Sequence, residues 1–79
     1  MKSMEWDERV WMATKDAVSG IPPFVRGRAL RKIISKAEEI AMERNALKVE
    51  SQDVWNAVEL AVPEMVKPMC RDALKEAGL

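Results

Sequence analysis

The sequence contains no histidine and no tyrosine, and Cys70 is its only cysteine. Histidine is the commonest metal ligand and proton carrier near neutral pH, so its absence argues against the usual zinc, haem and acid–base sites. One cysteine forms no internal disulfide, and an iron–sulfur cluster needs about four thiolates. Cys70 stands among apolar residues at helical spacing, so we expect a buried structural thiol rather than a nucleophile. We therefore expect no catalytic residues, no metal site and no cofactor.

The sequence also lacks a charge excess and a long apolar run. Its 13 basic residues balance 13 acidic ones, so net charge predicts no strong nonspecific binding to nucleic acid or to a membrane surface. No apolar run approaches the roughly 20 residues of a membrane span, and residues 1–7 lack the apolar core of a secretory signal. We expect a cytoplasmic protein that makes no membrane contact.

Glycine, proline and asparagine divide the chain into helical stretches, at Gly20, Pro22, Pro23, Asn45, Pro63 and Pro68. In the first stretch we expect Asp7 to be the N-cap, with Trp6 and Trp11 packed together across the start of the helix. Gly20 is predicted to end this helix in the left-handed conformation that glycine tolerates.

The second stretch, from Pro23 to about Asn45, is the longest and is predicted to be the scaffold. Its apolar stripe consists of Leu30, Ile33, Ile34, Ala37, Ile40 and Ala41. A short extended piece at 47–49, a third helix ending at Pro63 and a fourth from Pro68 to Ala77 follow. No segment indicates a sheet. The pattern predicts an all-α fold, a small bundle of three to four helices around one long central helix, in a single domain at 1–79.

Arg26 differs from the basic residues near it. At about 100° per residue, the apolar stripe includes Arg26, whereas Arg28, Arg31 and Lys32 fall on the opposite face. A guanidinium against apolar surface needs a partner, either a carboxylate or the last carbonyls of a neighbouring helix. The alternative is an arginine that binds the carboxylate of a partner or ligand. The candidate carboxylates within the chain are those of Asp7, Glu8 and Asp16.

Gly27 lies beside the stripe, where a glycine costs about 0.5–1 kcal/mol relative to alanine in a helix. Close approach of a second helix would offset that cost, and a hinge is the alternative. The three tryptophans are expected mainly in the core. Trp11 and Phe24 are nevertheless candidates for an exposed contact or dimer surface.

The charges of the second helix oppose its dipole. Basic residues crowd its N-terminal end and Glu38, Glu39 and Glu43 lie toward its C-terminal end, although each such placement costs about 0.3–1 kcal/mol when exposed. A solvated face explains the pattern, and so does an acidic partner that meets the basic end. The candidate interaction residues are Trp11, Phe24, Arg26, Gly27, Arg28, Arg31 and Lys32.

The segment Ile21-Pro22-Pro23-Phe24-Val25-Arg26-Gly27-Arg28-Ala29 carries a family resemblance, together with Trp6 before an acidic helix start and Val49 through Asp53-Val54 before the third helix. This pattern resembles the C-terminal domain of the B subunit of light-independent (dark-operative) protochlorophyllide reductase. The resemblance covers roughly 6–62, and the stretch at 68–77 lies beyond it. The chain is expected to be an excerpt of such a domain or a free-standing relative.

The resemblance implies a link to a nitrogenase-like oxidoreductase of chlorophyll and bacteriochlorophyll biosynthesis, in which other parts of the complex supply the iron–sulfur cluster and most of the pigment pocket. It implies an accessory protein–protein interaction domain whose partners are the reductase subunits. A second hypothesis is a histone-like module, because a long helix, an extended piece and Val49 through Asp53-Val54 are similar to the second half of a histone fold. Zero net charge argues against tight binding to duplex DNA. An independent enzyme is the weakest alternative.

Overall fold

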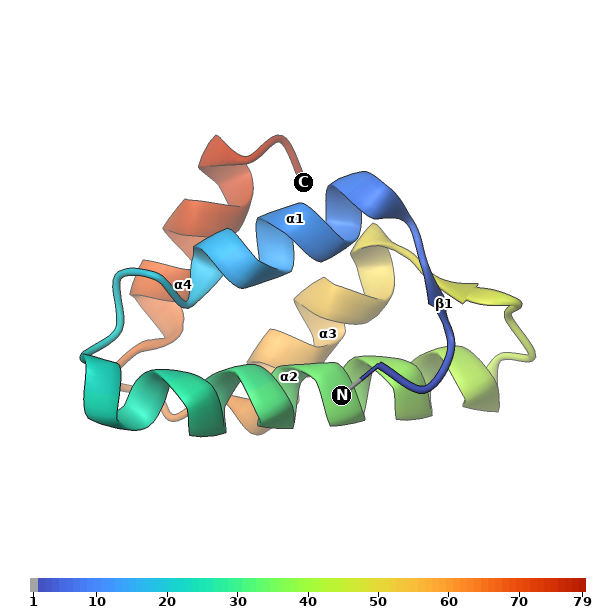
Figure 1. Cartoon of the computed structure of the whole chain (residues 1–79), viewed down its shortest axis with the longest axis horizontal. Helices are drawn as coiled ribbons and strands as arrows, with labels where there is room; N and C mark the ends of the chain where they lie inside the picture. The colour runs from blue at the N-terminus through green and yellow to red at the C-terminus, as the bar shows by residue number, and fades with distance from the viewer. Residues whose placement is uncertain (1) are drawn as a thin grey trace.

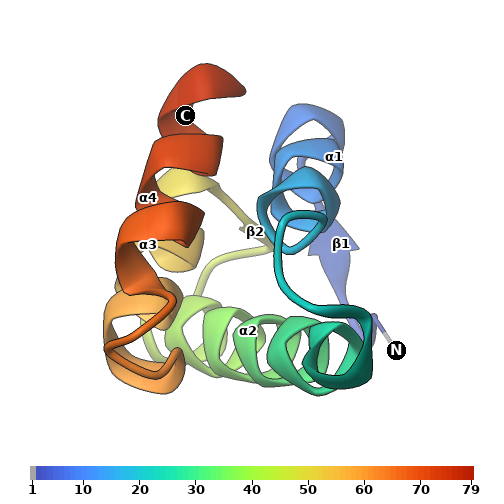
Figure 2. The ribbon, with the colours of Figure 1, turned by 90° about the vertical axis from the view of Figure 1, so that its left-hand side faces the viewer.

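Four helices and one small sheet make up residues 2–79, which are the residues that the computed structural model describes. In chain order the elements are β1 (Glu5–Trp6), α1 (Glu8–Ala17), α2 (Pro23–Glu43), β2 (Lys48–Val49), α3 (Ser51–Ala61) and α4 (Lys67–Glu76). Figure 1 shows α2 running along the length of the molecule with α1 above it, and Figure 2 shows α1 beside α4 over the base that α2 forms. The predicted all-α fold around one long helix is confirmed.

The start of α1 follows the prediction. Oδ1 of Asp7 accepts hydrogen bonds from the backbone N–H groups of Arg9 at 3.0 Å and Val10 at 3.3 Å, so Asp7 is the N-cap. The rings of Trp6 and Trp11 meet edge to face, with centroids 5.1 Å apart. This aromatic pair clamps the turn by which the chain enters the helix.

The predicted end of α1 is wrong in its details. The helix ends at Ala17, and Gly20 does not adopt the left-handed conformation. Two successive turns close the helix instead, because Ser19 N donates to Asp16 O at 3.1 Å and Ile21 N donates to Val18 O at 3.0 Å. Since these bonds satisfy the last carbonyls, a left-handed residue is not required.

The predicted bounds of α2 are close to those observed. Pro23 occupies its first position, where a missing N–H costs nothing. Asn45 follows the C-cap Arg44 with a φ of 59°, the left-handed conformation that asparagine tolerates better than most residues. The N–H of Ala46 then donates to Ala41 O at 2.9 Å, which turns the chain out of the helix toward β2.

The expectation that the chain contains no sheet is wrong. Strands β1 and β2 pair in parallel, with Glu5 opposite Lys48 and Trp6 opposite Val49. The N–H of Asp7 extends the pairing by donating to Val49 O at 3.1 Å. Each strand has two residues, too few for the alternation that identifies a strand in a sequence.

One apolar core joins all four helices. α2 packs most extensively on α3, and α1 packs on α4. α4 contributes Cys70 and Leu74, both fully buried, so the helix beyond the family-like part of the chain is integral to the core. Between residues 2 and 79, no helix combines the length and the apolar character that a membrane crossing requires.

Two buried carboxylates tie segments of the fold together. Glu38, in the C-terminal half of α2, accepts hydrogen bonds from Ser3, Met4 and Trp6 near the start of the chain. Asp53, in the first turn of α3, accepts two hydrogen bonds from Arg44, at 2.8 and 2.6 Å. The glutamate therefore holds the N-terminal segment on α2, and the aspartate fixes the turn between α2 and α3.

Candidate protein-binding site

An apolar cleft of about 360 Å³ opens where the N-terminal half of α2 meets the loop between α3 and α4. The end of the α1–α2 loop and the first turns of α2 contribute one wall, and the α3–α4 loop contributes the other. The lining residues are Ile21, Pro22, Phe24, Val25, Arg28, Ala29, Lys32, Pro63, Met65 and Val66. Six of the nine residues of the family-like segment at 21–29 therefore lie in its first wall, together with Lys32 from the next turn of α2.

Large apolar side chains project at this cleft rather than into the core. Phe24 is 87% exposed and Met65 is 93% exposed. Phe24 is the second residue of α2 and lies on the face opposite Ala29 and Ile33, which are buried. Exposed apolar side chains that cluster beside a concave surface are typical of protein interaction sites.

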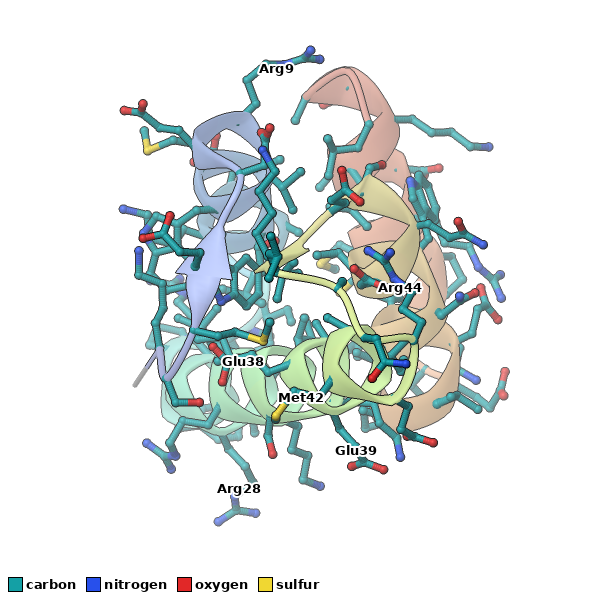
Figure 3. The ribbon with its side chains drawn as sticks, turned by 90° about the vertical axis from the view of Figure 1, so that its right-hand side faces the viewer. Arg9, Arg28, Glu38, Glu39, Met42 and Arg44 are labelled. Atoms are coloured by element: carbon teal, nitrogen blue, oxygen red, sulfur yellow. The ribbon has the colours of Figure 1, made fainter. Side chains whose placement is uncertain are left out.

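Basic side chains flank the apolar surface. Arg28 and Lys32 line the cleft and are exposed, and Arg31 is exposed on the same helix. In Figure 3, Arg28 extends away from the underside of α2. Within residues 2–79, none of these three cations lies within salt-bridge distance of a carboxylate. Their positive charge is therefore available to an acidic group outside the described chain.

Arg26 forms a contact within the chain. Its Nε and Nη2 donate to the carbonyl of Ile21 at 3.3 and 3.2 Å. This partner is a carbonyl of the loop between α1 and α2, so neither an expected carboxylate nor one of the last carbonyls of α1 is the observed partner. The guanidinium holds the loop between α1 and α2 against the first turns of α2, which shapes one wall of the cleft.

The expectation of close helix packing at Gly27 is wrong. Gly27 is exposed, and a Cβ built there would meet only Nη1 of Arg31, at 3.8 Å, among residues 2–79. No second helix of the described chain approaches this position. Gly27 lies on the outer side of α2, where it is exposed to solvent.

Trp11 lies outside the cleft. It is half-buried against Trp6, and the ammonium groups of Lys2 and Lys15 stand 4.6 and 5.5 Å from its ring centroid. These cations cover the ring from solvent. The structure therefore brings Phe24, Arg28 and Lys32 together and leaves Trp11 apart from them.

The sequence interpretation missed the second wall of the cleft. Pro63, Met65 and Val66 belong to the loop between α3 and α4. A sequence signal exists, since apolar Met65 and Val66 follow a helix-ending proline in a segment where polar residues are usual. Their position opposite Phe24 depends on how α3 packs on α2, which is a tertiary property.

Burial raises the pKa of the Cys70 thiol, which keeps it protonated and inert. Within residues 2–79 no three carboxylate or thiol side chains gather in a group that could hold a metal ion. Comparison with protein-family models, curated proteins and solved structures found no match for this chain. The resemblance of the segment at 21–29 to the reductase domain therefore stays a prediction from the sequence.

Proposed function

We propose that this chain is a cytoplasmic, non-catalytic interaction domain of the kind found at the C-terminus of the light-independent protochlorophyllide reductase B subunit. It docks a segment of a nitrogenase-like reductase subunit in the cleft between α2 and the α3–α4 loop. The observation that carries the proposal is that the family-like segment at 21–29 exposes Phe24 and Arg28 at an apolar cleft rather than burying them.

The cleft favours a particular kind of segment. Its apolar walls suit one or two apolar side chains, and Arg28 with Lys32 at its border suits a carboxylate beside them. An apolar anchor in a desolvated pocket supplies most of the affinity of such contacts, while peripheral charges mainly direct orientation. The proposed partner segment is therefore apolar at its centre and acidic at its edge.

Substitution of Met65 by aspartate tests the docking function. Met65 is almost fully exposed, so Met65→Asp should change the free energy of unfolding by less than about 0.5 kcal/mol. A carboxylate in the apolar wall should nevertheless weaken docking at least about tenfold, since one desolvated apolar anchor is worth more than about 1.4 kcal/mol. The measurement is co-purification of reductase subunits from the native host with the tagged chain, identified by mass spectrometry.

The matched control is Leu47→Asp. Leu47 is 92% exposed and lies beyond the far end of α2, outside the cleft. Wild-type and Leu47→Asp chains should both capture a nitrogenase-like reductase subunit, and Met65→Asp should not. If the folded wild-type chain recovers no such subunit across several growth conditions, the proposed function is wrong.

The histone-like alternative has one observation in its favour, which is the succession of α2, β2 and α3 with three exposed cations on α2. Balanced charge predicts that these cations neutralise too few phosphates for tight duplex binding. We expect fluorescence anisotropy of a labelled DNA duplex to stay unchanged at low salt. Binding that weakens steeply as salt rises would favour the histone-like function over reductase docking.

A further inference from the structure

The outer face of α2 has an ordered sequence of side chains that the docking cleft does not explain. This face consists of Phe24, Arg28, Arg31, Ser35, Glu39 and Met42, all of them exposed. Phe24 and Met42 are about five helical turns apart and so lie on the same side of the helix. From one end to the other, the face is apolar, basic, small and polar, acidic, and apolar again.

The charges of this face do not stabilise α2 itself. The basic half is near the positive end of the helix dipole, and Glu39 and Glu43 lie toward its negative end. Within residues 2–79, Glu39 pairs only with Lys36, at 3.2 Å, and its side chain keeps 55% of its exposure. A second molecule that presents the reverse order of charge would convert this unfavourable arrangement into attraction.

We infer that the outer face of α2 binds a second copy of this chain, with the two α2 helices antiparallel. The antiparallel arrangement places the basic half of each helix against the acidic half of the other. In one register it sets Phe24 opposite Met42 of the second copy and Arg28 opposite Glu39, with Ser35 near the two-fold axis. Every contact occurs twice, as a two-fold symmetric interface requires.

Two further features of the face fit such a contact. Ser35 is small, and at Gly27 on the neighbouring exposed side only the tip of the Arg31 side chain lies near the backbone, so the two helix backbones can approach closely. Figure 3 shows Arg28 and Glu39 extending from the side of α2 that faces away from α1 and α4, where the fold does not obstruct another helix. The face is about 30 Å long and one helix wide, which corresponds to a weak, salt-sensitive dimer rather than an obligate one.

This inference does not depend on the proposed function. Phe24 and Arg28 border both surfaces, whereas Met65 belongs to the cleft alone and Glu39 to the α2 face alone. Met65→Asp should therefore leave self-association unchanged, so failure of docking and failure of self-association are separate results.

Charge reversal in the basic half or the acidic half of the outer face of α2 tests the inference. The dimerisation of the full chain is measured by sedimentation equilibrium. The wild type should dimerise between about 10 µM and about 1 mM at low salt, and should dissociate as salt rises. One variant carries Arg28→Glu with Arg31→Glu, and a second carries Glu39→Lys with Glu43→Lys. Each should self-associate at least about tenfold more weakly than the wild type, and an equimolar mixture of the two should form a heterodimer.

A control variant tests whether weaker dimerisation comes from the outer face of α2 or merely from the change in net charge. Lys15→Glu with Lys75→Glu introduces the same charge change as the first variant, at exposed positions outside α2, and should preserve dimerisation to within about twofold. A wild type that stays monomeric across the whole concentration range overturns the inference. Double variants that dimerise like the wild type, or a mixture that stays monomeric, overturn it equally.

Discussion

Replacing Glu38 by alanine should lower the free energy of unfolding by about 3 kcal/mol, because one buried carboxylate holds the whole N-terminal segment. Glu38 is 4% exposed, and its Oε2 accepts from Trp6 Nε1 at 2.9 Å and from Ser3 N at 2.9 Å. Its Oε1 accepts from the Ser3 hydroxyl at 2.6 Å. Alanine leaves the buried indole N–H without an acceptor, which is the costliest of these losses.

Urea unfolding followed by tryptophan fluorescence measures this change, and hydrogen exchange at the Trp6 indole N–H locates it. The matched control is Glu39→Ala, one position along the helix on the exposed side, which should change stability by less than about 0.5 kcal/mol. Equal stabilities for the two variants would show that Glu38 does not anchor the N-terminal segment.

Low pH should weaken the hydrogen bonds by which Glu38 holds the N-terminal segment on α2. Burial on its own raises the pKa of Glu38, but the hydrogen bonds from Ser3, Trp6 and Met4 together outweigh it and hold the pKa below its ordinary value. A carboxyl whose pKa is lower in the folded state adds stability that is complete above its unfolded pKa of about 4.3. That contribution disappears as pH falls through the folded pKa. Glu38→Gln should therefore unfold with a shallower dependence on pH below about 4.

The helices could be predicted because their signals are local. Each signal depends only on residues close to it in the chain. Examples are the N-cap Asp7, the first-position proline Pro23 and the apolar stripe at helical spacing. The burial of Cys70 was predictable for the same reason. The end of α1 was not, because two hydrogen-bonded turns at 16–21 replaced the left-handed glycine that usually closes a helix.

The features that the sequence interpretation missed depend on segments far apart in the chain. Nothing in the sequence indicated that Glu38 is buried, because it accepts its hydrogen bonds only when residues 3–6 fold back on α2. The partner of Asp53 could not be read either, because Arg44 reaches it across the turn that the left-handed Asn45 makes. The sequence named Phe24, Arg28 and Lys32 as candidate interaction residues but predicted no cleft, because the wall from the α3–α4 loop depends on the packing of α3.

The remaining large effect concerns α4, where Leu74→Ala should lower the free energy of unfolding by about 3–4 kcal/mol. Leu74 is fully buried between α4 and the rest of the core, so its removal costs both the transfer energy of the side chain and the cavity left behind. A chain of this length has a total stability of about 4–12 kcal/mol, and the variant therefore loses a large fraction of it.

Two control variants show whether the loss of stability in Leu74→Ala comes from the loss of buried volume. Leu74→Met keeps most of the volume and should cost less than about 1.5 kcal/mol, while Lys75→Ala on the exposed side should be nearly neutral. The family-like part of the chain ends near Val62, so α4 would be dispensable if that part folded alone. If Leu74→Ala were as stable as Lys75→Ala, the part of the chain up to Val62 would fold without α4. The expected large loss instead makes α4 a structural requirement, because Leu74 and Cys70 are fully buried where α4 packs on α1 and α3.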